Sequence, residues 1–159
     1  DGHNWTYLNL PIEEIKQMAI ASIKDSVRMY MSCDVGKFYN KKSGVLSLNN
    51  YDYGSLFNTD FPMSKAERIS TFASASSHAM TLCAVDLDDK GQPRKWKVEN
   101  SWGLNSGVGG HLIMTDQWFD EYMFRLVVEK RFVPQRTLDL FKQKPTLLPA
   151  WDPLFKGEE

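Results

Sequence analysis

The segment from His78 to Asn100 restricts the fold most, because it follows the two-residue period of β-strands on both sides of a turn signal. The alternation predicts one strand over 78–86 and a second over 94–100. Between them, the run Asp88-Asp89-Lys90-Gly91 has the composition of a tight turn. The segment is therefore predicted to form an antiparallel β-hairpin.

The rest of the chain supplies further strands and several helices around this hairpin. Apolar spacing, caps and breakers predict helices over 11–24, 64–72, 116–122 and 134–142, and strands over 27–33, 110–115 and 123–132. The polar segment 37–60 is predicted to be a long excursion, and residues 144–159 to be an extended tail. Strands joined mostly by tight turns, with helices at the margins, predict one antiparallel α+β domain over residues 1–159.

The predicted hairpin brings a histidine and an asparagine together. If it is symmetric about Asp89, His78 lies opposite Asn100, and Leu82 lies opposite Trp96. Opposed residues have Cβ atoms about 4.5–5.5 Å apart, which suits a hydrogen bond between an amide and an imidazole. A register two residues away would keep the same apolar face inward, whereas a shift by one residue would expose it.

A histidine held by an asparagine has the chemistry of a general base. An amide oxygen that accepts from one ring nitrogen fixes the tautomer and leaves the other nitrogen free for a nucleophile's proton. When the nucleophile is a thiol, its pKa falls to about 3–4 and the proton moves in the resting state. We therefore nominate His78 and Asn100 as catalytic residues, supported by Ser101 and by Trp102, whose indole would exclude water from the contact.

A simpler interpretation is that His78 is a core or surface histidine and that Asn100-Ser101 opens a polar turn. The opposed positions of the two residues, with Ser-Trp-Gly following, favour the catalytic interpretation. No cofactor or metal is expected. The histidines are scattered, no CxxC motif exists, and the glycine run at 107–110 lacks the strand and helix that flank a phosphate loop.

Composition limits the class of function. The formal net charge of −1 gives no long-range attraction to nucleic acid or to an anionic membrane. No apolar run approaches the length of a transmembrane span. Cys33 and Cys83 lie in apolar, strand-like surroundings and are expected to be reduced core residues. This favours a cytoplasmic protein and leaves an exported form open.

Several stretches together resemble one branch of a known enzyme family. They are HAMT at 78–81, KWKVENSWG at 95–103 and MTDQWFDEY at 114–122, with further marks in CDVGKF at 33–38, YDY at 51–53 and LPAWDP at 148–153. The resemblance is to the bleomycin hydrolase and aminopeptidase C branch of the papain-like cysteine peptidases, and it extends along nearly the whole chain.

The resemblance implies the C-terminal, barrel-side half of a papain-like fold, with His78 as general base and acid and Asn100 as its orienting residue. It implies hydrolysis of peptides from the amino end through a thioester acyl-enzyme. In the family, the nucleophilic cysteine and the oxyanion-hole glutamine lie upstream on a helical half, and neither motif occurs here. The implied partners are peptide substrates, the Cys-bearing part of the same enzyme, and further copies in a barrel-shaped homohexamer.

The end of the chain departs from the family pattern. Family members end soon after Trp-Asp-Pro in an apolar segment whose terminal carboxylate is thought to hold the substrate's ammonium group. Here the chain ends in Leu-Phe-Lys-Gly-Glu-Glu at 154–159. Glu159, through its side chain or the terminal carboxylate, is therefore nominated to bind the α-ammonium group.

Three functions remain open on the sequence. The first is the thiol aminopeptidase described above, to which this chain contributes the base. The second is a non-catalytic assembly or regulatory fragment that has kept the fold without the Cys-bearing half. The third is a nucleic-acid-binding ring component, which would require a steep salt dependence of binding and gains no support from a net charge of −1.

Overall fold

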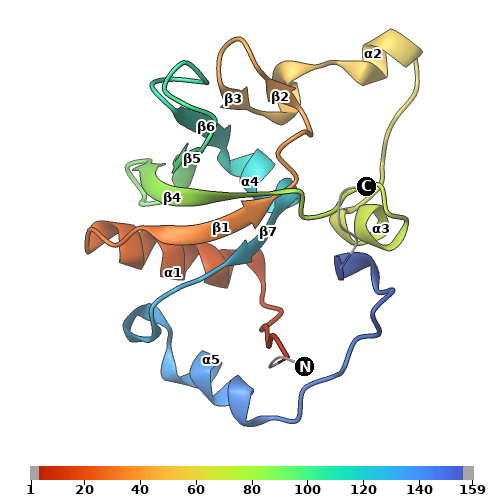
Figure 1. Ribbon diagram of the computed structural model, residues 1–159. Coiled ribbons are helices and arrows are strands. Elements are labelled where there is room, and N and C mark those ends of the chain that lie inside the picture. The colour runs from red at the N-terminus through yellow and green to blue at the C-terminus, as the bar shows by residue number, and fades with distance from the viewer. Residues whose placement is uncertain (1–3, 156–159) are drawn as a thin grey trace.

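The computed structural model describes residues 4–155, and its centre is a curved mixed sheet of seven strands (Figure 1). The strand order across the sheet is β2-β3-β6-β5-β4-β1-β7. Neighbouring strands are antiparallel except β3 and β6, which are parallel. The strands span Met29–Cys33 (β1), Tyr39–Asn40 (β2), Val45–Leu46 (β3), His78–Leu87 (β4), Pro93–Glu99 (β5), His111–Thr115 (β6) and Met123–Leu126 (β7).

The α-helices lie around this sheet, and the excursion that carries α2 projects away from it (Figure 1). α3, within the helix predicted over 64–72, starts with a capping box in which Ser64 and Glu67 bond each other's backbone amides. The helices span Ile12–Lys24 (α1), Tyr53–Phe57 (α2), Lys65–Ser70 (α3), Asp116–Tyr122 (α4) and Gln135–Asp139 (α5), with 3₁₀ turns at Leu48–Asn50, Lys130–Phe132, Leu140–Lys142 and Pro153–Phe155.

A buried lysine joins α1 and α4 on one face of the sheet. The ammonium of Lys16 donates to Asp116 Oδ2 at 2.7 Å and also pairs with Asp120. Asp116 accepts a second bond, at 2.9 Å, from the indole Nε1 of Trp96 on β5. Because the Lys16 side chain is only 10% exposed, these charge-assisted hydrogen bonds fix both helices to the sheet in one arrangement.

The hydrophobic core fills the space between these two helices and the sheet. The rings of Trp96 and Phe119 stack with centroids 4.6 Å apart, and Trp118 Nε1 donates to the carbonyl of Lys37 at 2.8 Å. Large side chains held in this way specify one packing arrangement. Buried members of the core include Met29, Met31, Cys33, Leu46, Met80, Leu82, Val98, Leu112, Met114, Tyr122 and Met123.

The α+β class is confirmed, but two predicted elements were wrong in detail. Segment 37–60 is not only an excursion, because β2 and β3 within it join the sheet edge and β3 pairs in parallel with β6. β7 ends at Leu126 rather than at 132, and residues 130–132 form a 3₁₀ turn. Strands of two residues show no readable period, and the pairing that creates them comes from a distant segment.

The register of the central hairpin also differs from the symmetric prediction. Leu82 lies opposite Val98, not Trp96. The hairpin is centred on Lys90 rather than on Asp89, because the amide of Asp88 donates to the carbonyl of Gln92 at 2.8 Å. The resulting shift of two residues keeps the predicted apolar residues on the core face, as expected for an even shift.

The two cysteines have different environments. Cys33 is fully buried, as predicted, and burial raises the pKa of its thiol to about 12. Cys83 was predicted to lie in the core, but it is half-buried at an irregularity in the β4–β5 pairing, and its Sγ donates to the carbonyl of Lys97 at 3.3 Å. Both cysteines are free.

Two glycines allow the loop at 103–110 to lie against the start of β3. A Cβ on Gly107 would lie 2.2 Å from the carbonyl oxygen of His111, and one on Gly44 would lie 2.5 Å from Cα of Gly107. Both residues have positive φ, 61° and 70° respectively. Only glycine satisfies both the backbone conformation and the space at these positions.

We expect Gly107→Ala to destabilise the protein more than Gly91→Ala. At both sites the positive φ makes an alanine less stable than glycine by about 1–2 kcal/mol. A Cβ at Gly91 would meet only open space. The clash at Gly107 adds about 1–3 kcal/mol. Chemical denaturation of the two variants measures the difference, and equal losses would contradict the close approach.

No helix within residues 4–155 combines the length and the apolar content needed to cross a membrane.

Candidate active site

The side chains of His78 and Asn100 meet at one end of the sheet. His78 is the first residue of β4, and its Nε2 lies 2.8 Å from Oδ1 of Asn100. The backbone amide of Ser101 donates to the same oxygen at 2.8 Å. Because Oδ1 accepts from Ser101, the oxygen faces the ring, so Nε2 must carry the proton. This tautomer leaves Nδ1 of His78 free to accept a proton.

The contact between these residues is diagonal rather than directly opposed. The last paired residues of the hairpin are Thr81 and Glu99, so Asn100 already lies beyond the ladder. Its backbone amide donates to the carbonyl of Gly110 at 2.9 Å, which extends the bonding between β5 and β6 by one step beyond Glu99 and His111. Diagonal neighbours across a strand pair are still within reach of long side chains. The predicted hydrogen bond is therefore present, although the register that led to it was wrong.

Trp102 covers one face of the imidazole. The rings of His78 and Trp102 stack with centroids 4.8 Å apart and planes 28° apart. Tyr39 of β2 lies against the indole, with its ring centroid 5.9 Å away. Trp102 itself stays 45% exposed. The indole therefore covers one face of the imidazole beside the His78–Asn100 hydrogen bond.

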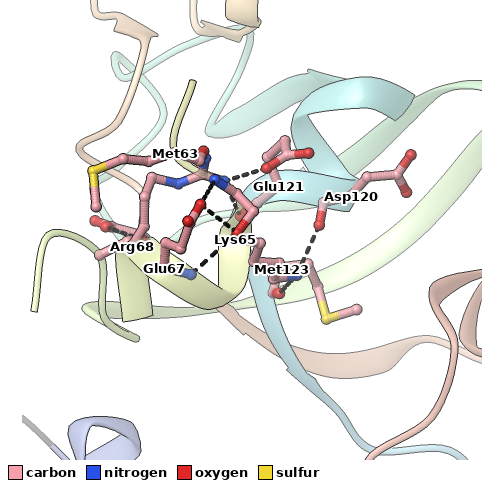
Figure 2. A network of polar contacts seen from close by, with 10 residues as sticks. Met63, Lys65, Glu67, Arg68, Asp120, Glu121 and Met123 are labelled. Atoms are coloured by element: carbon pink, nitrogen blue, oxygen red, sulfur yellow. Dashed lines mark hydrogen bonds and ion pairs between the residues drawn. The ribbon is translucent and has the colours of Figure 1, made fainter. Parts of the chain in front are cut away.

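The segment that leads to His78 is anchored through α3. Figure 2 shows Lys65 of α3 directed at the end of α4, where its Nζ donates to the carbonyls of Asp120 at 2.7 Å and Met123 at 2.6 Å. The last carbonyls of a helix have no partner within the helix, so an outside donor is needed there. Burial lowers the pKa of Lys65 to about 8.

Arg68 makes the second connection between α3 and the end of α4. It forms an ion pair with Glu121 (Figure 2). Its guanidinium lies over the ring of Tyr122, 5.1 Å from the centroid. The carbonyl of Tyr122 accepts from the amide of Asp34 at 3.0 Å. The end of α4 is thus bonded to α3, which precedes β4 in the chain, and to Asp34, which follows the strand β1 that pairs with β4.

Neither cysteine has the environment of a nucleophile. Cys33 is the backbone partner of His78 across β1 and β4, but burial and the neighbouring Asp34 raise the pKa of its thiol, which stays protonated at neutral pH. Burial also raises the pKa of Cys83. Among the described residues, no group of three or more His, Cys, Asp and Glu is arranged to hold a metal ion.

The C-terminal tail approaches the same end of the sheet. The carbonyl of Leu154 accepts from Arg125 of β7 at 3.1 Å, and the 3₁₀ turn at Pro153–Phe155 contacts α3. Figure 1 shows this part of the tail beside α3. Glu159, nominated as an anchor for a substrate ammonium group, lies outside the described residues.

Comparison with known proteins places the chain in a family. The model of the Peptidase C1-like family matches residues 1–155. The chain belongs to the Peptidase C1-like family. The resemblance noted in the sequence is thereby confirmed.

Relatives of this Peptidase C1-like chain are much longer than the chain itself. Bleomycin hydrolase of Homo sapiens is 45% identical over 156 residues, which cover 96% of this chain and 34% of the relative. Aminopeptidase C of Lactococcus lactis is 38% identical over 153 residues, with 96% and 35% covered. The crystal structure of PepW from Lactobacillus rhamnosis has a TM-score of 0.88 at 43% identity, with 92% of this chain and 33% of that chain covered. The Peptidase C1-like chain spans about a third of the length of the curated relatives it matches.

Sequence reasoning did not assign roles to Asp34 or Lys65. Asp34 appeared only as part of the stretch at 33–38, and Lys65 only within the helix predicted over 64–72. Their contacts are with segments 40 to 58 positions away, so no local pattern could have revealed them.

Proposed function

We propose that this chain supplies the general base, His78, and its orienting residue, Asn100, to a cysteine-type aminopeptidase. The observation that carries the proposal is the 2.8 Å contact between His78 Nε2 and Asn100 Oδ1, with the oxygen fixed by the amide of Ser101. A neutral amide orients the ring without adding a second negative charge, so the imidazolium stays available to pair with a thiolate. Membership of the Peptidase C1-like family supports the same chemistry.

The mechanism follows from the free ring nitrogen. Nδ1 of His78 takes the proton of a thiol supplied by the Cys-bearing part of the enzyme, and the thiolate attacks the peptide carbonyl. The resulting imidazolium then donates that proton from Nδ1 to the leaving amine, which departs and leaves a thioester. In the second half, Nδ1 takes a proton from water, the hydroxide attacks the thioester, and the proton returns to the thiolate as the acid leaves.

Exposed apolar residues near the site support a partner surface for the Cys-bearing part. Leu104, two residues after Trp102, is 81% exposed. Aromatic rings continue along the excursion, where Tyr51 stacks on Tyr53 and Tyr53 on Phe57. Contiguous exposed apolar patches mark interaction surfaces.

The homohexamer implied by the family resemblance remains part of this proposal. A cytoplasmic location is also part of it, because the two cysteines are free.

The proposal also includes the amino-terminal preference of the enzyme. The described part of the tail reaches α3, close to the end of the sheet that carries His78. We propose that Glu159, or the terminal carboxylate, binds the α-ammonium group of the peptide from there. Such a charge-assisted contact would select substrates with a free amino end.

The test uses a polypeptide that contains both this chain and the Cys-bearing part, which we call the complete enzyme. It is expected to hydrolyse peptides with a free amino end and to lose activity on stoichiometric alkylation of one thiol. The 159-residue chain alone is expected to show no turnover. Loss of activity with a metal chelator, or full activity after alkylation of every thiol, would reject the proposal.

The alternative function is a non-catalytic assembly or regulatory fragment. The observation in its favour is that neither Cys33 nor Cys83 is activated as a thiolate. It predicts that the native protein purifies without a reactive thiol on itself or on a bound companion. Labelling with a thiol-directed epoxide distinguishes the two functions directly.

A further inference from the structure

A buried carboxylate lies beside the segment that leads into β4. Asp34 directly follows β1 and is 6% exposed. Its Oδ2 accepts from Ser74 Oγ at 2.7 Å and from the amide of Ala75 at 3.4 Å, and its Oδ1 accepts from Ser77 Oγ at 3.4 Å. Three of the four residues before His78 are therefore tied to one side chain.

The charge of this carboxylate has no cation beside it. Within residues 4–155, Asp34 takes part in no ion pair with lysine, arginine or histidine. The titratable groups that feel its charge are Cys33 and Tyr122, and burial raises the pKa of both, so both are neutral at neutral pH. A buried charge that is held by hydrogen bonds alone is costly for stability, which indicates another reason for its presence.

The segment held by Asp34 sets the position of His78. The amide of Ser77 donates to the carbonyl of Cys33 at 3.0 Å, and Cys33 is the backbone partner of His78 in the β1–β4 pairing. Asp34 thus fixes the chain immediately before His78, while Asn100 and Trp102 fix the imidazole from the other side. A displacement of the histidine by a fraction of an ångström would lengthen its 2.8 Å contact with Asn100.

We propose that Asp34 is a positioning residue for His78, acting through its hydrogen bonds to residues 74–77. This inference rests on the proposed function, because it matters only if His78 is the general base. A misplacement of about 1 Å at a catalytic group can cost about 100-fold in rate. Loss of one anchor displaces the ring less than this, and the expected effect is about tenfold.

The chain offers a matched control in the same segment. Ser76 Oγ donates to Ser32 Oγ at 2.9 Å and does not contact Asp34. In the complete enzyme, Ser74→Ala and Asp34→Asn are expected to lower kcat about tenfold with little change in KM, whereas Ser76→Ala should leave kcat within about twofold. Ser74→Ala keeps the carboxylate and serves where Asp34→Asn does not fold.

The decisive readout is the pH profile of kcat/KM, with the rate of thiol alkylation measured in parallel. A displaced His78 stabilises the thiolate less, so the acidic limb moves to higher pH in Ser74→Ala and Asp34→Asn and stays in place in Ser76→Ala. Unchanged profiles in the first two variants, whatever their melting temperatures, would overturn the inference. The variant His78→Ala separates the two proposals, because an unaltered alkylation profile there would reject the proposed function itself.

Discussion

In the complete enzyme, His78→Ala is expected to lower kcat by about 10²–10⁴-fold, the range that a positioned general base contributes. The reason is that Nε2 of His78 is bonded to Asn100, so Nδ1 is the ring nitrogen that can take the thiol's proton. Without it, the nucleophile stays a thiol at neutral pH, and its alkylation should slow to the rate of an ordinary cysteine. Substrate binding should change much less than kcat.

A second histidine provides the control for this experiment. His111 lies on β6 of the same sheet, and its Nδ1 is 2.9 Å from the carbonyl of Gly109, so its contact is with the glycine loop and not with the site. His111→Ala should therefore retain kcat close to the unmodified enzyme. Equal activity in His78→Ala and His111→Ala would remove the basis for assigning His78 as the base.

Lys65→Met is expected to lower the stability of the protein by an amount that depends on pH. The change removes the donor to the carbonyls of Asp120 and Met123 while keeping the apolar stem. Each buried acceptor left without a partner costs about 1–3 kcal/mol. The substitution also removes the cost of burying an ammonium group, which offsets part of the loss at the two carbonyls. We expect the free energy of unfolding to fall by about 1–3 kcal/mol at pH 7.5.

This loss should grow with pH. Burial lowers the pKa of Lys65 in the folded protein to about 8, against 10.5 for the ordinary side chain. Because the folded state releases this proton first, the stability that Lys65 contributes rises as pH increases from 8 to 10.5. The difference between wild type and Lys65→Met should therefore widen by about 2 kcal/mol between pH 7.5 and 9.5.

An exposed lysine tests whether the effect is specific. Lys142 pairs with Asp139 at 2.7 Å, and its side chain is 77% exposed. Lys142→Met should change the free energy of unfolding by about 0–1 kcal/mol at both pH values, as for surface ion pairs. Urea unfolding of the three proteins gives the comparison. A difference between wild type and Lys65→Met that does not vary with pH would show that Lys65 is not buried as described.

Prediction from sequence succeeded where the information is local. The alternation around the turn at 88–91 was sufficient to find β4 and β5, and the apolar spacing after Pro11 was sufficient to find α1. It failed for β2 and β3, because two-residue strands exist only through their partners. It also misplaced the hairpin register, because the closing bond from Asp88 to Gln92 and the irregularity at Cys83 cannot be read from alternation alone.

The sequence by itself determined which residues come together in the candidate site. His78, Asn100 and Trp102 lie within one hairpin and the turn that follows it, so strand geometry alone brings them within reach of one another. Only the tertiary structure decided how that site is supported. Asp34 and Lys65 bond segments that are 40 and 58 positions away, and such contacts depend on how helices and sheet pack, which no local pattern encodes.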